Sequence, residues 1–151
     1  LERAAQVLKE LHGEPNAMYW KQRANVSIEQ EELTKASEYI TEAFALAPSD
    51  PNAHDIAAEI ALKQDSKKKA IEHWGKAGMF YNETERWDRA EISLAYAIEN
   101  GADDADTLRA IGLAQVKTGH ILQAKITIKK LLEKDATDRV AIELQSMLPK
   151  E

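Results

Sequence analysis

The chain has 151 residues and a net charge of −6, and 44% of its residues are hydrophobic. This composition suits one folded domain with a substantial core and excludes a disordered chain. An acidic chain without a long basic stripe binds nucleic acid poorly, so we expect no nucleic-acid partner. The lack of cysteine excludes disulfides and thiolate metal sites. It leaves the compartment undecided between the cytoplasm and a bacterial periplasm.

The sequence predicts an all-α fold of about nine antiparallel helices. Strong helix formers dominate the chain, and no run alternates in the way that a strand requires. No apolar run reaches the ~18–20 residues needed to cross a bilayer, so we expect no direct membrane insertion. In chain order, the expected helices cover residues 2–11, 17–27, 31–46, 51–63, 67–82, 85–100, 104–118, 121–134 and 138–148.

A multi-point pattern recurs four times along these helices. Each copy has a small residue with a larger residue four positions before it, and an alanine twelve positions after it. A small residue lets two helices approach closely, and the bulky neighbour fills the adjacent groove. The small residues are Ala24, Ala58, Gly78 and Gly112. The alanines that follow them are Ala36, Ala70, Ala90 and Ala124.

The pattern resembles the tetratricopeptide repeat (TPR), in which a front helix and a back helix form an antiparallel hairpin. Trp74, Ala77, Gly78 and Tyr81 give the best match to its first helix, and Ala90 continues it. The resemblance implies a right-handed superhelix of hairpins with a concave groove lined by the front helices. Such hairpins bury their outer faces by stacking on one another.

The spacing between copies is irregular in the middle of the chain. Ala24 and Ala58 are 34 residues apart, as are Gly78 and Gly112, but Ala58 and Gly78 are only 20 apart. We therefore expect one TPR-like domain over residues 1–151 with a slip in repeat phase near residues 67–84. Its parts are a partial repeat at 1–12, repeats at 17–50, 51–84, 71–104 and 105–138, and a terminal helix at 139–148.

Two interpretations of this overlap stay open at the level of sequence. In the first, the helix at 67–82 serves as the back helix of one repeat and the front helix of the next. Its apolar residues, which include Ala70, Trp74 and Phe80, exceed the width of an ordinary amphipathic stripe. In the second, one of the two signatures is accidental and the solenoid is regular.

The candidate binding residues are those that the resemblance places on the concave faces of the front helices. They mix apolar and polar side chains, which suits an extended or helical peptide. The shared helix adds Glu72, Met79 and Asn82 as further candidates. The main set is Met18, Lys21, Asn25, Ile28, Asn52, Asp55, Glu59, Leu62, Asp106, Arg109, Leu113 and Val116.

The sequence contains no catalytic constellation, so we expect no enzyme activity, no cofactor and no metal site. The four histidines lack the spacing of a metal motif, and no phosphate-binding loop or nucleophile elbow is present. Within the TPR family, carboxylate-clamp co-chaperones grip a C-terminal carboxylate with converging positive charge. Lys21 and Asn25 match the first clamp positions, but Ile56 and Glu72 stand where an asparagine and a lysine are expected.

The sequence thus predicts a non-catalytic scaffold that binds a protein or peptide segment in its concave groove. A bacterial assembly, secretion or envelope complex is one expected setting. The alternatives are a regulatory or oligomerisation module of a larger enzyme, and a carboxylate-clamp co-chaperone. The start at Leu1 instead of Met leads us to expect a longer parent protein, and self-association into a homo-oligomer stays open.

Overall fold

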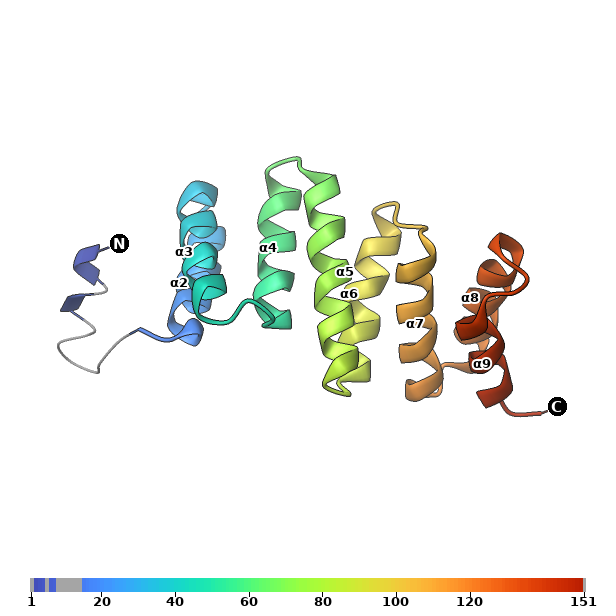
Figure 1. Ribbon diagram of the computed structural model, residues 1–151. Helices are drawn as coiled ribbons and strands as arrows, with labels where there is room; N and C mark the ends of the chain where they lie inside the picture. The colour runs from blue at the N-terminus through green and yellow to red at the C-terminus, as the bar shows by residue number, and fades with distance from the viewer. Residues whose placement is uncertain (1, 5, 8–14, 151) are drawn as a thin grey trace.

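A computed structural model describes residues 2–4, 6–7 and 15–150. Eight helices with defined bounds follow one another between residues 15 and 150 (Figure 1). Of the predicted helix at 2–11 and the partial repeat at 1–12, the structure describes residues 2–4 and 6–7, which are helical. The helices are α2 (Ala17–Glu29), α3 (Leu33–Leu46), α4 (Pro51–Lys63), α5 (Lys67–Glu83), α6 (Trp87–Glu99), α7 (Ala105–Thr118), α8 (Ile121–Lys134) and α9 (Arg139–Met147).

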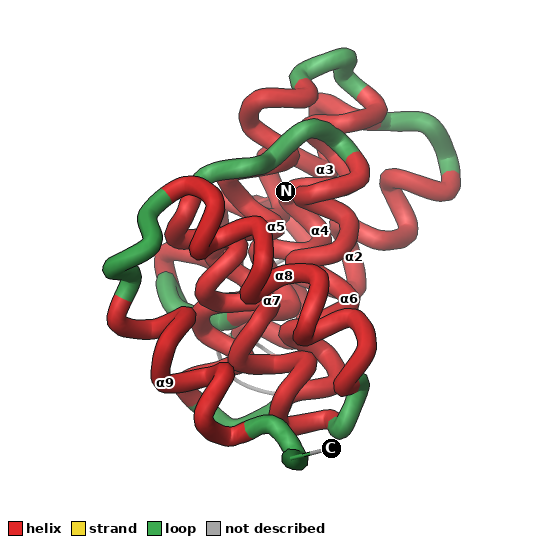
Figure 2. The backbone as a smooth tube through the Cα atoms, turned by 90° about the vertical axis from the view of Figure 1, so that its right-hand side faces the viewer, coloured by secondary structure: helices red, strands yellow, loops and turns green. Residues whose placement is uncertain are grey.

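The all-α prediction is confirmed over the described residues, in which helices alternate with short loops and no strand occurs (Figure 2). No helix in this part of the chain is long and apolar enough to cross a membrane. The predicted starts at residues 31 and 85 are two residues too early. Glu31 and Glu85 are turn residues with φ values of 61° and 58°, so α3 begins at Leu33 and α6 at Trp87.

Four helix-to-helix turns share one backbone design. Each has a residue with positive φ at the same place, and the next helix begins two residues later. In each turn the residue after the positive-φ position donates a backbone hydrogen bond to the carbonyl five residues back, which is a Schellman ending. The positive-φ residues are Glu31, Asp65, Glu85 and Gly119. Their spacings are 34, 20 and 34 residues, the same as those of the repeated small residues.

The repeated small residues lie at close helix contacts. Ala36, Ala70, Ala90 and Ala124 are all fully buried. A Cβ atom built at Gly78 would lie 2.2 Å from Cγ of Leu94, so α5 and α6 approach as closely as their side chains allow. The pattern read from the sequence therefore marks real packing positions.

Helix α5 is a single continuous helix that packs on both sequence neighbours. It forms antiparallel pairs with α4 and with α6, and it also contacts α7. Next-nearest contacts join α2 to α4 in the first part of the chain, and α5 to α7 and α7 to α9 in the second. In Figure 1, α5, α7 and α9 lie side by side, with α6 and α8 behind them. We call the helices that contact their next-nearest neighbours the inner row. This row consists of α2 and α4 in the first part of the chain and of α5, α7 and α9 in the second, so it changes at α5.

Candidate functional site

The predicted binding residues do not line one continuous groove, because the inner row changes at α5. Those from α2 and α4 lie on helices that contact each other, whereas those from α7 lie beside α5 and α9. Met18 and Asn25 are exposed on α2, and Asp106 is exposed on α7. Asn52 is half-buried, and Leu62 is exposed near the end of α4. The set divides into two groups on different helix rows.

One groove of about 450 Å³ runs across α5, α7 and α9. We call it the C-terminal groove. Its surface is largely apolar, and the side chains of Met79 and Met147 are 51% and 43% exposed. Arg109, Lys117 and Glu143 supply charged groups along its wall. The full lining is Met79, Asn82, Arg109, Ala110, Leu113, Lys117, Val140, Glu143, Leu144 and Met147.

Two residues of the main predicted set, Arg109 and Leu113, line the C-terminal groove, as do Met79 and Asn82 of the shared helix. The residues from α9 were not predicted. The sequence held a signal for them, since Ile142 and Ser146 follow the front-helix pattern of the earlier repeats. A terminal helix with that pattern extends the inner row by one more member.

Asn82 has an unpaired acceptor in the wall of the C-terminal groove. Its side-chain Nδ2 donates a hydrogen bond of 3.0 Å to the backbone carbonyl of Ala110, which joins α5 to α7. This bond fixes the orientation of the amide. The other amide atom, Oδ1, is buried and has no hydrogen-bond partner. A buried acceptor without a partner costs free energy, so the contact between α5 and α7 is made at some cost at this atom.

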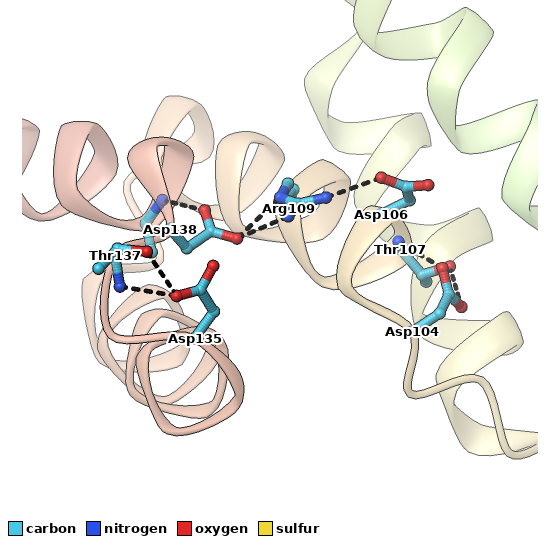
Figure 3. A network of polar contacts seen from close by, with 8 residues as sticks. Asp104, Asp106, Thr107, Arg109, Asp135, Thr137 and Asp138 are labelled. Carbon is cyan, nitrogen blue, oxygen red and sulfur yellow. Dashed lines mark hydrogen bonds and ion pairs between the residues drawn. The ribbon is translucent and has the colours of Figure 1, made fainter.

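Arg109 joins α7 to the start of α9 (Figure 3). Its Nε and Nη2 bind Oδ2 of Asp138 at 2.9 and 2.8 Å, and its Nη1 binds Asp106 at 2.8 Å. Asp138 is the N-cap of α9 and accepts a hydrogen bond from the backbone of Ala141. The hydrogen bonds from Arg109 and from this backbone hold the pKa of Asp138 below its ordinary value. Arg109 therefore positions α9 against α7.

Lys21 makes the equivalent contact in the first part of the chain. Its Nζ lies 2.8 Å from Oδ2 of Asp50, the N-cap of α4, and the residue is only 8% exposed. Lys21 and Arg109 both stand three residues before a repeated small residue. This ion pair argues against the carboxylate clamp, because the ammonium of Lys21 already holds a carboxylate of its own chain.

Ile28 is a correction to the predicted set. It is 7% exposed and belongs to the core between α2, α3 and α4, where Trp20 and Tyr39 also lie. The prediction of a groove position is wrong because the Ile28 side chain packs inside this core, although Val26 and Glu29 in the same turn are exposed. Val116 on α7 is half-buried and packs against the core around Leu108.

A second cavity, of about 480 Å³, lies where α4, α5 and α6 meet. Asp55 and Glu59 of the predicted set line it, together with Trp74 from α5 and residues of α6. Asp55 accepts hydrogen bonds from the hydroxyls of Ser93 at 2.7 Å and Tyr81 at 3.1 Å. Burial raises the pKa of the Asp55 carboxyl above its ordinary value. This cavity and the C-terminal groove use different sides of α5.

The histidines form no metal centre in the described part of the chain. No group of three or more His, Asp or Glu side chains there could hold an ion. His54 and His73 instead face each other across α4 and α5, with their Nδ1 atoms 3.1 Å apart. His54 Nε2 donates to the carbonyl of Pro48 at 3.0 Å, which leaves its Nδ1 as the acceptor for His73. Burial lowers the pKa of both imidazoles.

No protein-family model and no curated protein matches the sequence. Among solved structures, the chain is similar to one in the APC/C hetero-tetramer Cut9–Hcn1, with 17% identity over 98% of this chain and a TM-score of 0.46. It spans about a third of that chain, 32% of its length. PilF of Pseudomonas aeruginosa is 21% identical over 87% of this chain and 67% of its own, with a TM-score of 0.41.

YrrB, described as a TPR protein with an unusual peptide-binding site, is 18% identical over 97% of this chain and 89% of its own. Its TM-score is 0.43, and none of the three likenesses reaches 0.5. The repeated small residues, buried alanines and Schellman turns of this chain build a series of helical hairpins. These hairpins resemble those of the tetratricopeptide repeat.

Proposed function

We propose that this chain is a non-catalytic scaffold that binds a segment of a partner protein in the C-terminal groove. The observation that carries the proposal is a largely apolar groove in which the side chains of Met79 and Met147 are about half exposed. An apolar surface rimmed by a few fixed polar groups suits a peptide, whose side chains supply apolar contact and whose backbone supplies N–H donors.

The partner segment that fits best carries apolar side chains. Met79 on α5 and Met147 on α9 offer flexible, polarisable contact surface in the groove. Arg109 is occupied by two aspartates, and Lys117 lies 5.6 Å from the ring centre of Trp87. Apolar contact therefore dominates recognition, and charge contributes less.

We further propose that the domain consists of repeats 17–50, 51–84, 71–104 and 105–138, with 139–148 as the terminal helix. On this division α5 is the back helix of one hairpin and the front helix of the next. Equivalent Schellman turns at Asp65 and Glu85, on both sides of α5, support the division. The consequence for function is that α5, α7 and α9 form the binding row, while α2 and α4 form a separate one.

Two matched methionine variants test the proposed groove. A pull-down with the unaltered chain identifies a binding protein, and its affinity is then measured for Met79→Glu and Met18→Glu. Both methionines are about half exposed, so neither change removes core packing. Met79→Glu places a charge in the groove and is expected to weaken binding at least tenfold, because an apolar contact must then desolvate a carboxylate. Met18→Glu is expected to bind normally.

The reverse ranking would move the site to the α2 and α4 row, and equal affinities of all three proteins would exclude both rows. Circular dichroism of each variant checks that the helices are retained. Because the chain has only three methionines, spectra of their ¹³C-labelled methyl groups report binding directly. Addition of the partner should shift the Met79 and Met147 signals and leave that of Met18 unchanged.

A further inference from the structure

We propose that the cavity between α4 and α6 binds a lysine or arginine side chain of a partner protein. This acidic-aromatic pocket is lined by Asp55, Glu59, Trp74, Arg89, Ile92, Ser93 and Tyr96. The inference deepens the proposed scaffold function, on which it rests, but it concerns residues that do not line the C-terminal groove. It assigns a chemical class of ligand to a site that lies on the other row of helices.

The acidic wall of the pocket comes from α4. Asp55 and Glu59 are one helical turn apart, and both line the cavity. The Asp55 carboxylate is held in place by neutral donors, the hydroxyls of Ser93 and Tyr81. Arg89 also lines the pocket; its guanidinium lies 5.7 Å from the ring centre of Tyr81, and its charge acts on Asp55 without an ion pair shorter than 4 Å. The pocket therefore has two carboxylates and one guanidinium, and it keeps a net negative charge.

The equivalent positions in the other repeats show what is unusual about Asp55. Lys21, Asp55 and Arg109 each stand three residues before a repeated small residue. Lys21 and Arg109 are cations that pair with the N-cap aspartate of the next helix in their row. At the slip this position carries an acid, and the N-cap of α6 is Arg86, so the pairing of a cation with an N-cap aspartate does not occur there. A cation from outside the chain would restore the type of pairing that the chain makes for itself elsewhere.

The opposite wall of the pocket suits the rest of a basic side chain. Tyr96 stacks on Trp74 with ring centres 5.4 Å apart, and Tyr96 is half exposed. The exposed face of an aromatic ring attracts a cation. Ile92, also half exposed, offers apolar surface for the methylene groups of lysine or arginine. Carboxylates on one wall and an aromatic ring on the other select a cationic group that carries an aliphatic stem.

Small amide probes test the pocket without the partner protein. The full chain, labelled with ¹⁵N and ¹³C, is titrated with N-acetyl-lysine N-methylamide, with the arginine analogue and with the neutral norleucine analogue. The basic probes should give saturable shifts at Glu59, Ile92 and Tyr96, and the norleucine probe should give shifts that are smaller and do not saturate over the same range. The spectra are recorded at low salt, because partly exposed charges are screened.

Glu59→Gln is the test variant, and Glu42→Gln, which removes the same charge from the exposed face of α3, is its control. Glu59→Gln should weaken the dissociation constant of the basic probes about threefold, as expected for a partly exposed ion pair, and Glu42→Gln should not change it. Equal shifts with the norleucine probe, or equal effects of the two variants, would overturn the proposal. The groove test with Met79→Glu is unaffected by either result, so the two failures can be told apart.

Discussion

At both ends of the solenoid, a cation of one helix pairs with the N-cap aspartate of the next helix in its row, but the rows are different. In the first part, α2 contacts α4, and Lys21 on α2 pairs with the N-cap Asp50 of α4. In the second, α7 contacts α9, and Arg109 on α7 pairs with the N-cap Asp138 of α9. This ion pair recurs within the chain, but the row of helices that makes it changes at α5. Repeat arrays tolerate such a change because each hairpin needs only its nearest neighbours.

The two parts also differ in what their inner rows offer to a ligand. In the row of α2 and α4, Lys21 is buried in an ion pair with Asp50, and Ile28 belongs to the core. The row of α5, α7 and α9 keeps two exposed methionines and the unpaired amide oxygen of Asn82. The two rows therefore differ in the groups that they expose.

Helix α5 can belong to both halves because it is buried on more than one side. Ala70 and Trp74 pack into the cluster that includes Ala58 and Ala61 of α4, whereas Ala77 and Tyr81 pack with Leu94 of α6. An ordinary surface helix buries one stripe, and its other side is polar. The change of row thus depends on a helix with two apolar contact surfaces.

The largest expected effect comes from Gly78, at the tightest contact between α5 and α6. Gly78→Ala should lower the free energy of unfolding by roughly 1–3 kcal/mol, because the new Cβ overlaps the fully buried Leu94. Gly75→Ala is the matched control on the same helix. Nothing lies within 4 Å of a Cβ at Gly75, so this change should stabilise the protein by about 0.5–1 kcal/mol through helix propensity.

Urea denaturation of both glycine variants measures these changes. The opposite signs are the informative part, since the two substitutions are chemically identical and three residues apart. If Gly78→Ala proved as stable as Gly75→Ala, α5 and α6 would not be packed as closely as a shared helix requires.

A smaller effect is expected from pH, through the His54 and His73 pair that joins α4 to α5. Both imidazoles have a lowered pKa in the fold, so the unfolded chain takes up protons more readily. The stability that the neutral pair contributes is present above the ordinary histidine pKa of about 6.5, and it is lost as the pH falls through the lower folded values. Lys76 reinforces the shift at both rings, whereas Asp50 opposes it at His54.

Denaturation midpoints between pH 8 and pH 5 check this dependence in the unaltered chain and in His73→Phe. The variant removes one titrating group from a site already lined by the rings of Phe44 and Phe80, and its stability should fall less on acidification. An identical pH dependence for both proteins would place the acid sensitivity elsewhere, outside the contact between α4 and α5.

The smallest effect is expected at the turns on either side of α5. Asp65 and Glu85 have φ values of 58°, a conformation that glycine adopts more readily than other residues. Asp65→Gly and Glu85→Gly should each raise the free energy of unfolding by about 0.5 kcal/mol, after the extra freedom of glycine in the unfolded chain is subtracted. Gly119 shows that the repeat accepts glycine here. Thermal unfolding of both variants measures these changes. If one variant were stabilised and the other strongly destabilised, the two turns would not be equivalent.

The sequence was sufficient to predict the helices, because turns and small residues repeat with fixed spacing. The bounds of α4 and α8 are those expected, and the single helix at α5 follows from the two overlapping signatures. The site was harder to predict, since the resemblance places groove residues relative to one helix and not to its neighbours. It could not show that Lys21 forms an ion pair with Asp50, or that α9 supplies a wall of the C-terminal groove.

The central claim is that α5 and α7 lie together in the inner row of the second half of the chain. The hydrogen bond from Asn82 Nδ2 to the carbonyl of Ala110 is its most direct reporter, because it exists only if these helices touch. In the free chain, the side-chain amide protons of Asn82 should show nuclear Overhauser contacts to protons of Ala110 and exchange slowly with solvent. Rapid exchange and no contact to α7 would contradict the account.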